Sequence, residues 1–205
     1  MKQTDIQQEL PAPDPSLSSN PFMKKSKLQY EAPEFDKIKN EHFKPAFNYG
    51  LKQHEAEIIK IANNPAAPTF ENTIVALEKS GEVLRRAQIV FSNLTSANTN
   101  PTLQALDEEY APIFAAHSDK LYLNENLYKR IQSIKEDGLD SESKRLVQYY
   151  KQNFEIAGAN LSAADKEKLK QLNQELASLS TQYANKLLEA RKQGGVFFSD
   201  AKELD

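Results

Sequence analysis

The stretch SAADKEKLKQLNQELASLSTQYANKLLEARKQGG, residues 162–195, decides the fold class. It opens with Ser162 and Asp165 in a pattern that resembles a capping box, which starts a helix. Apolar residues then recur at intervals of three and four, the period of one helix face. They are Leu169, Leu172, Leu176, Leu179, Tyr183 and Leu187. Gly194-Gly195 ends the pattern, so we expect a helix of about thirty residues whose leucine stripe packs on another helix.

Charged residues flank this stripe: Lys166, Lys168, Lys170, Glu175 and Lys186. Charges at such positions are typical of a face turned to water. We therefore expect the flanks of the helix to be solvated.

The first half of the chain also predicts helices. A pattern running from Glu41 to Ile61 stops at Asn63-Asn64-Pro65. A second stripe begins after Thr69 and keeps its phase through Gly81 as far as Leu94, which predicts one long helix. Glycine in a helix interior costs about 1 kcal/mol relative to alanine, so Gly81 indicates close packing against a neighbour.

Further residues mark where helices begin, bend or end. Asn100 is a plausible N-cap with Pro101 at the first helical position. Pro112 predicts a kink or a break near residues 108–111. Shorter helices should begin at Asn124 and Asp140, with Gly138 and Gly158 at the helix ends.

These patterns predict an all-α fold, an irregular antiparallel lobe of about six helices with a long C-terminal helix. Residues 1–35, rich in Pro and Ser, read as an extended leader, and residues 36–193 as the lobe. Residues 194–205 read as the start of a further segment. Their apolar Val196-Phe197-Phe198 has nothing to pair with before the chain ends, so we expect truncation there.

Composition excludes several classes of function. The 205 residues carry 26 Lys+Arg against 29 Asp+Glu, without a basic block, so neither nucleic acid nor an anionic membrane is indicated as a partner. There is no cysteine, which excludes disulfides, thiolate catalysis and cysteine-ligated zinc in this chain. No apolar run is long enough to span a membrane.

The three histidines are His42, His54 and His117. His54-Glu55-Ala56-Glu57-Ile58 approaches the helical His-Glu-x-x-His zinc motif, but Ile58 stands where the second histidine is needed. One imidazole cannot hold a catalytic zinc, so we interpret His54 as ordinary surface polarity.

Other motifs also lack the residues that their chemistry needs. Asp137-Gly138-Leu139-Asp140-Ser141-Glu142 is without a calcium-loop register and reads as a helix junction. Gly194-Gly195 lacks the third glycine of a phosphate loop, and no Gly-x-Ser-x-Gly occurs. Asp107, Glu108 and Glu109 point in divergent directions on a helix, and one of Tyr149-Tyr150 should be core. The sequence therefore predicts no catalytic, cofactor-binding or metal residue in this chain.

Several stretches nevertheless resemble the opening of bacterial peptidyl-dipeptidases, members of the thimet-oligopeptidase family of zinc metallopeptidases. In the first half they are NPF (20–22), APEFDKI (32–38), EHFKPAF (41–47), NNP (63–65), PTFENTI (68–74), ALEKSG (76–81) and NLTSANT (93–99). In the second half they are LYLN (121–124), LDSESKRLV (139–147), AGA (157–159), ADK (164–166) and KQGGV (192–196). The resemblance is collinear from about residue 20 to the end.

The resemblance implies a mostly helical, two-lobed parent enzyme several times longer, with a substrate channel between the lobes. The parent would bind zinc through a downstream His-Glu-x-x-His motif and a later Glu, and release dipeptides from the C-terminus of short peptides. None of those residues has a counterpart here. This chain would form one wall of the channel, complete its packing with the missing catalytic region, and be inactive alone.

One alternative is a stand-alone helical binding or scaffold module without catalysis. The compartment, cytoplasmic or periplasmic, also stays open, since the leader before Asn20 would fit an omitted export signal.

Overall fold

The computed structural model describes residues 17–194, 200 and 202. All regular structure in this part of the chain is helical, which confirms the all-α class. Short 3-10 turns come first: η2 (Pro21–Met23), η3 (Gln29–Glu31), η4 (Phe35–Lys37) and η5 (Asn40–His42). The longer elements are α1 (Phe43–Ala62), the π-helical turn η6 (Phe70–Val75), α2 (Ala76–Glu78), α3 (Glu82–Ala97), α4 (Pro101–Tyr122), α5 (Glu125–Gln132), α6 (Ser141–Ile156) and α7 (Ala163–Gln193).

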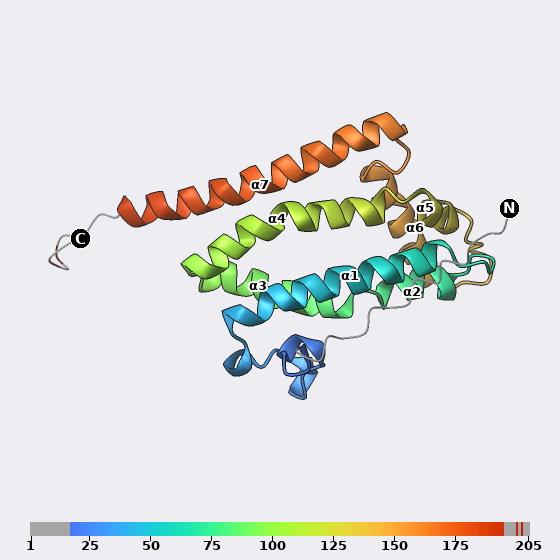
Figure 1. The fold of residues 1–205 in the computed structure, drawn as a ribbon. Coiled ribbons are helices and arrows are strands. Elements are labelled where there is room, and N and C mark those ends of the chain that lie inside the picture. Colours follow the sequence, from blue (N-terminus) through green and yellow to red (C-terminus); the bar gives the residue numbers. More distant parts are fainter. Residues whose placement is uncertain (1–16, 195–199, 201, 203–205) are drawn as a thin grey trace.

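The lobe is elongated because its longest helices lie lengthwise and alternate in direction, as Figure 1 shows for α1, α3, α4 and α7. α1 packs against α3 and α4, and α7 lies along α4 at the outer edge. α5 and α6 close one end, and η2 packs on α3. The antiparallel arrangement expected from the sequence is therefore confirmed.

An aromatic cluster holds the N-terminal turns, α1, α3 and α4 together. Phe47 lies at its centre, with ring centroids 5.2 Å from Phe91 and 5.0 Å from Tyr110. Phe22 is 3% exposed and its ring lies 5.1 Å from that of Phe43. Asn20 fixes this turn by accepting from the Phe22 amide and donating to the His42 carbonyl.

Phe22 therefore packs with the lobe, although we assigned it to the extended leader. Burial of its large apolar ring stabilises the fold, and the ring could not be buried in this way if it belonged to an unstructured tether. The first sixteen residues of the leader and Val196-Phe197-Phe198 lie outside the described residues. The division into domains stays a prediction.

A second group of buried side chains, here the distal cluster, fills the other end of the lobe. Its members come from α1, η6, α2, α5 and α6 and include Ile58, Ile74, Leu77, Leu127, Ile131, Val147 and Phe154. The expected caps are confirmed there, since Asn124 accepts from the Leu127 amide and Asp140 from the Ser143 amide. Local side-chain chemistry thus sets where α5 and α6 begin.

The single long helix predicted after Thr69 is wrong. The chain forms η6 and α2, turns at residues 79–81, and starts again as α3. Gly81 is the residue before α3 and has a φ of 67°, the left-handed conformation that favours glycine. The expected close packing at Gly81 is confirmed, although it lies in a turn.

Pro112 does not break α4, which is one helix from Pro101 to Tyr122. Figure 1 shows the ribbon of α4 changing direction near its middle. A bend is the expected response to a proline that cannot donate to the carbonyl of residue 108. The predicted kink is thus confirmed, and the alternative of a break is wrong.

α7 has the expected length, 31 residues, and Ser162 caps it by accepting from the Asp165 amide. Its leucine stripe, however, does not pack on another helix within the described residues. Leu172, Leu176 and Tyr183 are 60%, 64% and 69% exposed. Hydrogen bonds from Asn173 to Asp119 and from Asn185 to Glu108 join a different face of α7 to α4. Lys166, which we expected in water, is only 6% exposed and lies 3.6 Å from Glu125 of α5.

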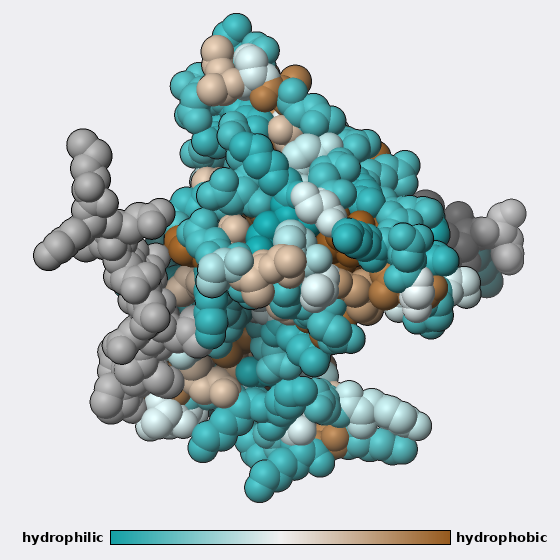
Figure 2. Space-filling view, turned by 90° about the vertical axis from the view of Figure 1, so that its right-hand side faces the viewer, coloured by the Kyte–Doolittle hydropathy of each residue, from teal (hydrophilic) through white to brown (hydrophobic). Residues whose placement is uncertain are grey.

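The surface at the end of the lobe that α5 and α6 close is mostly hydrophilic. Figure 2 looks at the end that lies on the right of Figure 1 and shows hydrophobic residues only in scattered positions there. Among the described helices, none combines the length and the apolar character needed to cross a bilayer.

Candidate functional site

The most chemically suggestive group in the lobe is a pair of histidines from α1 and α4. His54 Nδ1 and His117 Nε2 lie 2.9 Å apart, and their ring centroids are separated by 4.9 Å. Ser80 Oγ lies 3.2 Å from His54 Nε2 on the other side of the same ring. His54 is therefore not the ordinary surface polarity that we expected from the sequence.

The hydrogen bonds around Ser80 assign the tautomers. Ser80 Oγ donates its one proton to the Leu77 carbonyl at 2.7 Å, so it accepts from His54 Nε2–H. His54 Nδ1 then carries the lone pair and accepts from His117 Nε2–H. Both rings are neutral in this network.

Burial reinforces that neutral state. Burial, followed by the neighbouring His117 ring and Arg85, lowers the pKa of His54 to about 4. Burial also lowers the pKa of His117, against a smaller opposing effect of the Glu55 carboxylate. Because the pKa of each ring lies below the ordinary value of 6.5, both rings are uncharged near neutral pH.

Gly81 and Glu57 lock the turn onto the histidine pair. Glu57 Oε2 accepts from the Gly81 amide at 2.7 Å. A Cβ added at Gly81 would lie 2.9 Å from His54 Cγ, closer than real Cβ contacts. The turn at residues 79–81 can therefore approach α1 only because Gly81 has no side chain.

This arrangement does not make Ser80 a nucleophile. A serine nucleophile needs a base that accepts its proton, whereas the Ser80 proton is directed to a backbone carbonyl and His54 donates to the hydroxyl. The group instead joins α1, α4 and the turn before α3 through directed hydrogen bonds.

The pair also does not fit a zinc ion. A zinc ligand must turn a ring lone pair to the metal, but the facing nitrogens of His54 and His117 are bonded to each other. In residues 17–194, 200 and 202, no three His, Asp or Glu side chains converge in a way that could hold a metal. No step of zinc chemistry is assigned to these residues.

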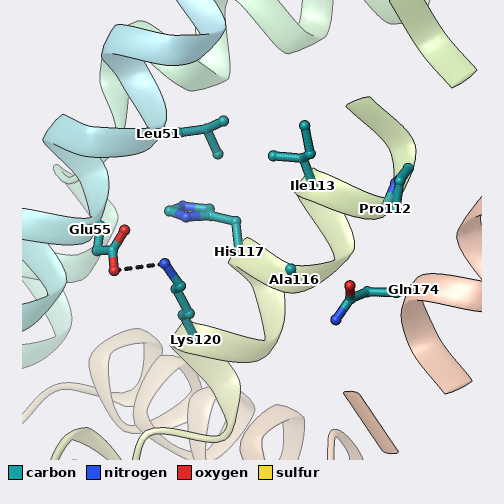
Figure 3. A pocket seen from close by; sticks show the side chains of 8 residues that line it. All are labelled: Leu51, Glu55, Pro112, Ile113, Ala116, His117, Lys120 and Gln174. Atoms are coloured by element: carbon teal, nitrogen blue, oxygen red, sulfur yellow. Dashed lines mark hydrogen bonds and ion pairs between the residues drawn. The ribbon is translucent and has the colours of Figure 1, made fainter. Parts of the chain in front are cut away.

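A shallow pocket of about 390 Å³ lies beside the pair, between α1, α4 and α7 (Figure 3). Lys120 Nζ lies 2.8 Å from Glu55 Oε1 across one side of it. The other lining residues are Leu51, Pro112, Ile113, Ala116, His117 and Gln174. The pocket thus offers a mostly apolar wall with one ion pair and the edge of an imidazole.

The remaining sequence candidates are separate from this group and serve local structure. His42 Nδ1 accepts from the Lys39 amide at 3.1 Å, next to the start of α1. Gly138, two residues before the Asp140 cap, has a φ of 83°, which confirms the helix junction. Of the two tyrosines, Tyr150 is partly buried and donates to Glu78 at 2.8 Å, whereas Tyr149 is 50% exposed.

The acidic triplet on α4 diverges as expected. Glu109 pairs with Lys44 at 2.6 Å, and Glu108 accepts from Asn185 at 2.8 Å. Burial raises the pKa of Asp107. The three carboxyl groups thus have different surroundings, which does not suit paired acid–base work.

Sequence reasoning missed the contact between the two histidines. His54 and His117 are 63 residues apart and Ser80 is 26 residues from His54, so only the packing of α1 on its neighbours brings them together. The signal that was available is Gly81, which indicated close approach by a neighbour.

The chain is similar to known peptidases over most of its length. No family model matches it. It is 48% identical over 189 residues to dipeptidyl carboxypeptidase of Escherichia coli, and this match covers 90% of the chain and 28% of the relative. It is 46% identical to the dipeptidyl carboxypeptidase of Salmonella typhimurium, with the same coverage of both proteins. It is also 26% identical over 179 residues to oligopeptidase A of Escherichia coli, covering 85% of this chain and 26% of that protein.

The chain thus spans little more than a quarter of the length of these curated relatives. Its similarity extends over nearly all of its own residues, and the relatives have the peptidase names that the sequence motifs led us to expect. The similarity over nine tenths of the chain fits an N-terminal part of a protein of the thimet-oligopeptidase family.

Proposed function

We propose that this chain is the N-terminal helical lobe of a zinc metallopeptidase that removes C-terminal dipeptides from short peptides. The observation that carries the proposal is the 48% identity to a dipeptidyl carboxypeptidase over 90% of the chain, against 26% identity to an oligopeptidase A. The difference in identity favours the dipeptide-releasing branch of the family.

In this proposal the lobe contributes shape, and the remaining chain contributes the zinc site. It forms one wall of the substrate channel and is inactive alone. The engagement of His54 and His117 with each other supports this division, because the pair has no role left in metal binding. Zinc in the complete enzyme would polarise the scissile carbonyl and activate water.

A stand-alone binding module is the second candidate. The exposed leucines of α7 favour it, because a contiguous apolar face is typical of a surface that binds another helix. This candidate predicts a natural protein of about the mass of this chain, without hydrolytic activity.

The native mass and activity separate the two candidates. An antibody raised against the 205-residue chain should detect a protein several times larger than 23.2 kDa in its source cell. The purified material should release dipeptides, lose this activity with a chelator and regain it with zinc. The 205-residue chain alone is the control and should release none.

A native species of 23.2 kDa without hydrolysis would reject the lobe proposal and support the binding module. Dipeptide release by the 205-residue chain itself would contradict the proposed division of labour. Fractionation of the same cells with the antibody would decide between the cytoplasm and the periplasm.

A further inference from the structure

The open face of α7 is a heptad seam. Leu172, Leu176, Leu179 and Tyr183 follow one another at intervals of four, three and four residues, as a and d positions do in paired helices. Leu179 is 55% exposed and Leu187, at the end of the same face, is 39% exposed. We call these five residues the α7 seam.

The lobe holds α7 by nearly the opposite side. Lys166, Asn173, Ala177, Thr181 and Asn185 are all more buried than the α7 seam. With 3.6 residues per turn, the centres of the two faces lie roughly 140° apart around the helix. Packing on α4 therefore leaves the α7 seam uncovered within the described residues.

The seam is short and its C-terminal end is basic, which argues against a second copy of this chain. It spans about two heptads, fewer than the three or four over which a heptad pattern is typical of a coiled coil. At the C-terminal end Lys186, Arg191 and Lys192 outnumber Glu189. At the other end the lysines are paired with acids: Lys166 with Glu125, Lys168 with Asp165 and Lys170 with Glu167. Parallel pairing of two copies would bring the basic C-terminal ends together.

We propose that the α7 seam binds an amphipathic helix of the remaining chain of the complete protein, with leucine-like residues facing the seam and acidic residues near its basic C-terminal end. This proposal rests on the proposed function. The first relative is covered over only 28% of its length, so most of the parent chain lies outside this lobe. A helix in the same polypeptide has a high effective concentration, so a two-heptad contact suffices.

Thiol labelling of the complete protein tests this. The 205-residue chain contains no cysteine, so Leu176→Cys places a probe within the seam. Gln182→Cys is the matched control, because Gln182 is exposed and lies away from both the seam and α4. Labelling by a maleimide is followed by mass spectrometry of the peptide that carries each position, in the complete protein and in the 205-residue chain.

The expected result is labelling of position 176 roughly tenfold or more slower in the complete protein than in the 205-residue chain, with position 182 equally fast in both. Equal labelling of position 176 in both would overturn the proposal. Labelling of position 176 in the 205-residue chain that slows as the concentration of this chain is raised would also overturn the proposal, because it would indicate pairing with a second copy. Because the readout needs no catalysis, an active complete enzyme with an unprotected seam rejects this inference and leaves the proposed function standing.

Discussion

Substituting Gly81 with alanine should destabilise the lobe far more than the same change at Gly138. Both glycines have positive φ, 67° and 83°, so an alanine at either position adopts a left-handed backbone that costs about 1–2 kcal/mol. A Cβ at Gly138 meets no atom within 4 Å, whereas a Cβ at Gly81 meets the His54 ring at 2.9 Å. Gly138→Ala therefore isolates the backbone cost.

The additional cost at Gly81 comes from moving a ring that cannot move freely. His54 is hydrogen-bonded to both His117 and Ser80, so displacing it costs a further 1–3 kcal/mol or so, the range for overpacking. We expect a total loss of about 2–5 kcal/mol for Gly81→Ala, against about 1–2 kcal/mol for Gly138→Ala.

Urea denaturation of the 205-residue chain followed by circular dichroism measures both losses. A double-mutant cycle with His54→Ala then tests the cause, because removing the ring should make Gly81→Ala cost only about as much as Gly138→Ala. Equal losses for the two glycine variants, or a cycle without coupling, would refute the close-approach explanation.

Three further predictions concern pH and local structure. The pKa of His54 is lowered to about 4 in the folded chain, against 6.5 when unfolded, so the unfolded chain binds the proton first and the stability should fall as the pH drops from 6.5 toward 4. The urea midpoint should change less across this pH range in His54→Gln than in the unchanged protein. Identical pH profiles of the two proteins would contradict the network. Arg130→Met removes the donor to the Asn64 and Ala66 carbonyls and should cost about 2–4 kcal/mol with faster proteolysis of residues 63–69, whereas neighbouring exposed Lys129→Met should have little effect. Asp140→Ala should cost about 1 kcal/mol through loss of the α6 cap, as read from the thermal midpoint, and an unchanged midpoint would argue against the cap.

Helix starts were the most predictable part of this fold, because a cap is a local interaction. Asn100, Asn124, Asp140 and Ser162 each accept from an amide three residues later, so sequence neighbours alone determine the geometry. The family could be predicted for a similar reason, since its motifs are contiguous stretches.

Helix continuity and helix orientation were less predictable. The stripe around Gly81 keeps its phase across a π-helical turn and a left-handed residue, and periodicity counts residues without detecting either. The leucines of α7 predict an apolar face, but the sequence does not show that α4 packs on a different face of this helix. The contact of His54 with His117 depends on how two helices pack, which no spacing encodes.

The division of the interior into an aromatic cluster and a distal cluster gives α1 a mechanical role. Phe43 and Phe47 lie in the first, and Ile58 and Ile61 in the second, so one helix is anchored at both ends of the lobe. Local opening of α5 and α6 would leave the Phe47 end of this helix buried. α1 thus joins the two clusters as one continuous helix, so local opening at one end of the lobe leaves the other end of α1 packed.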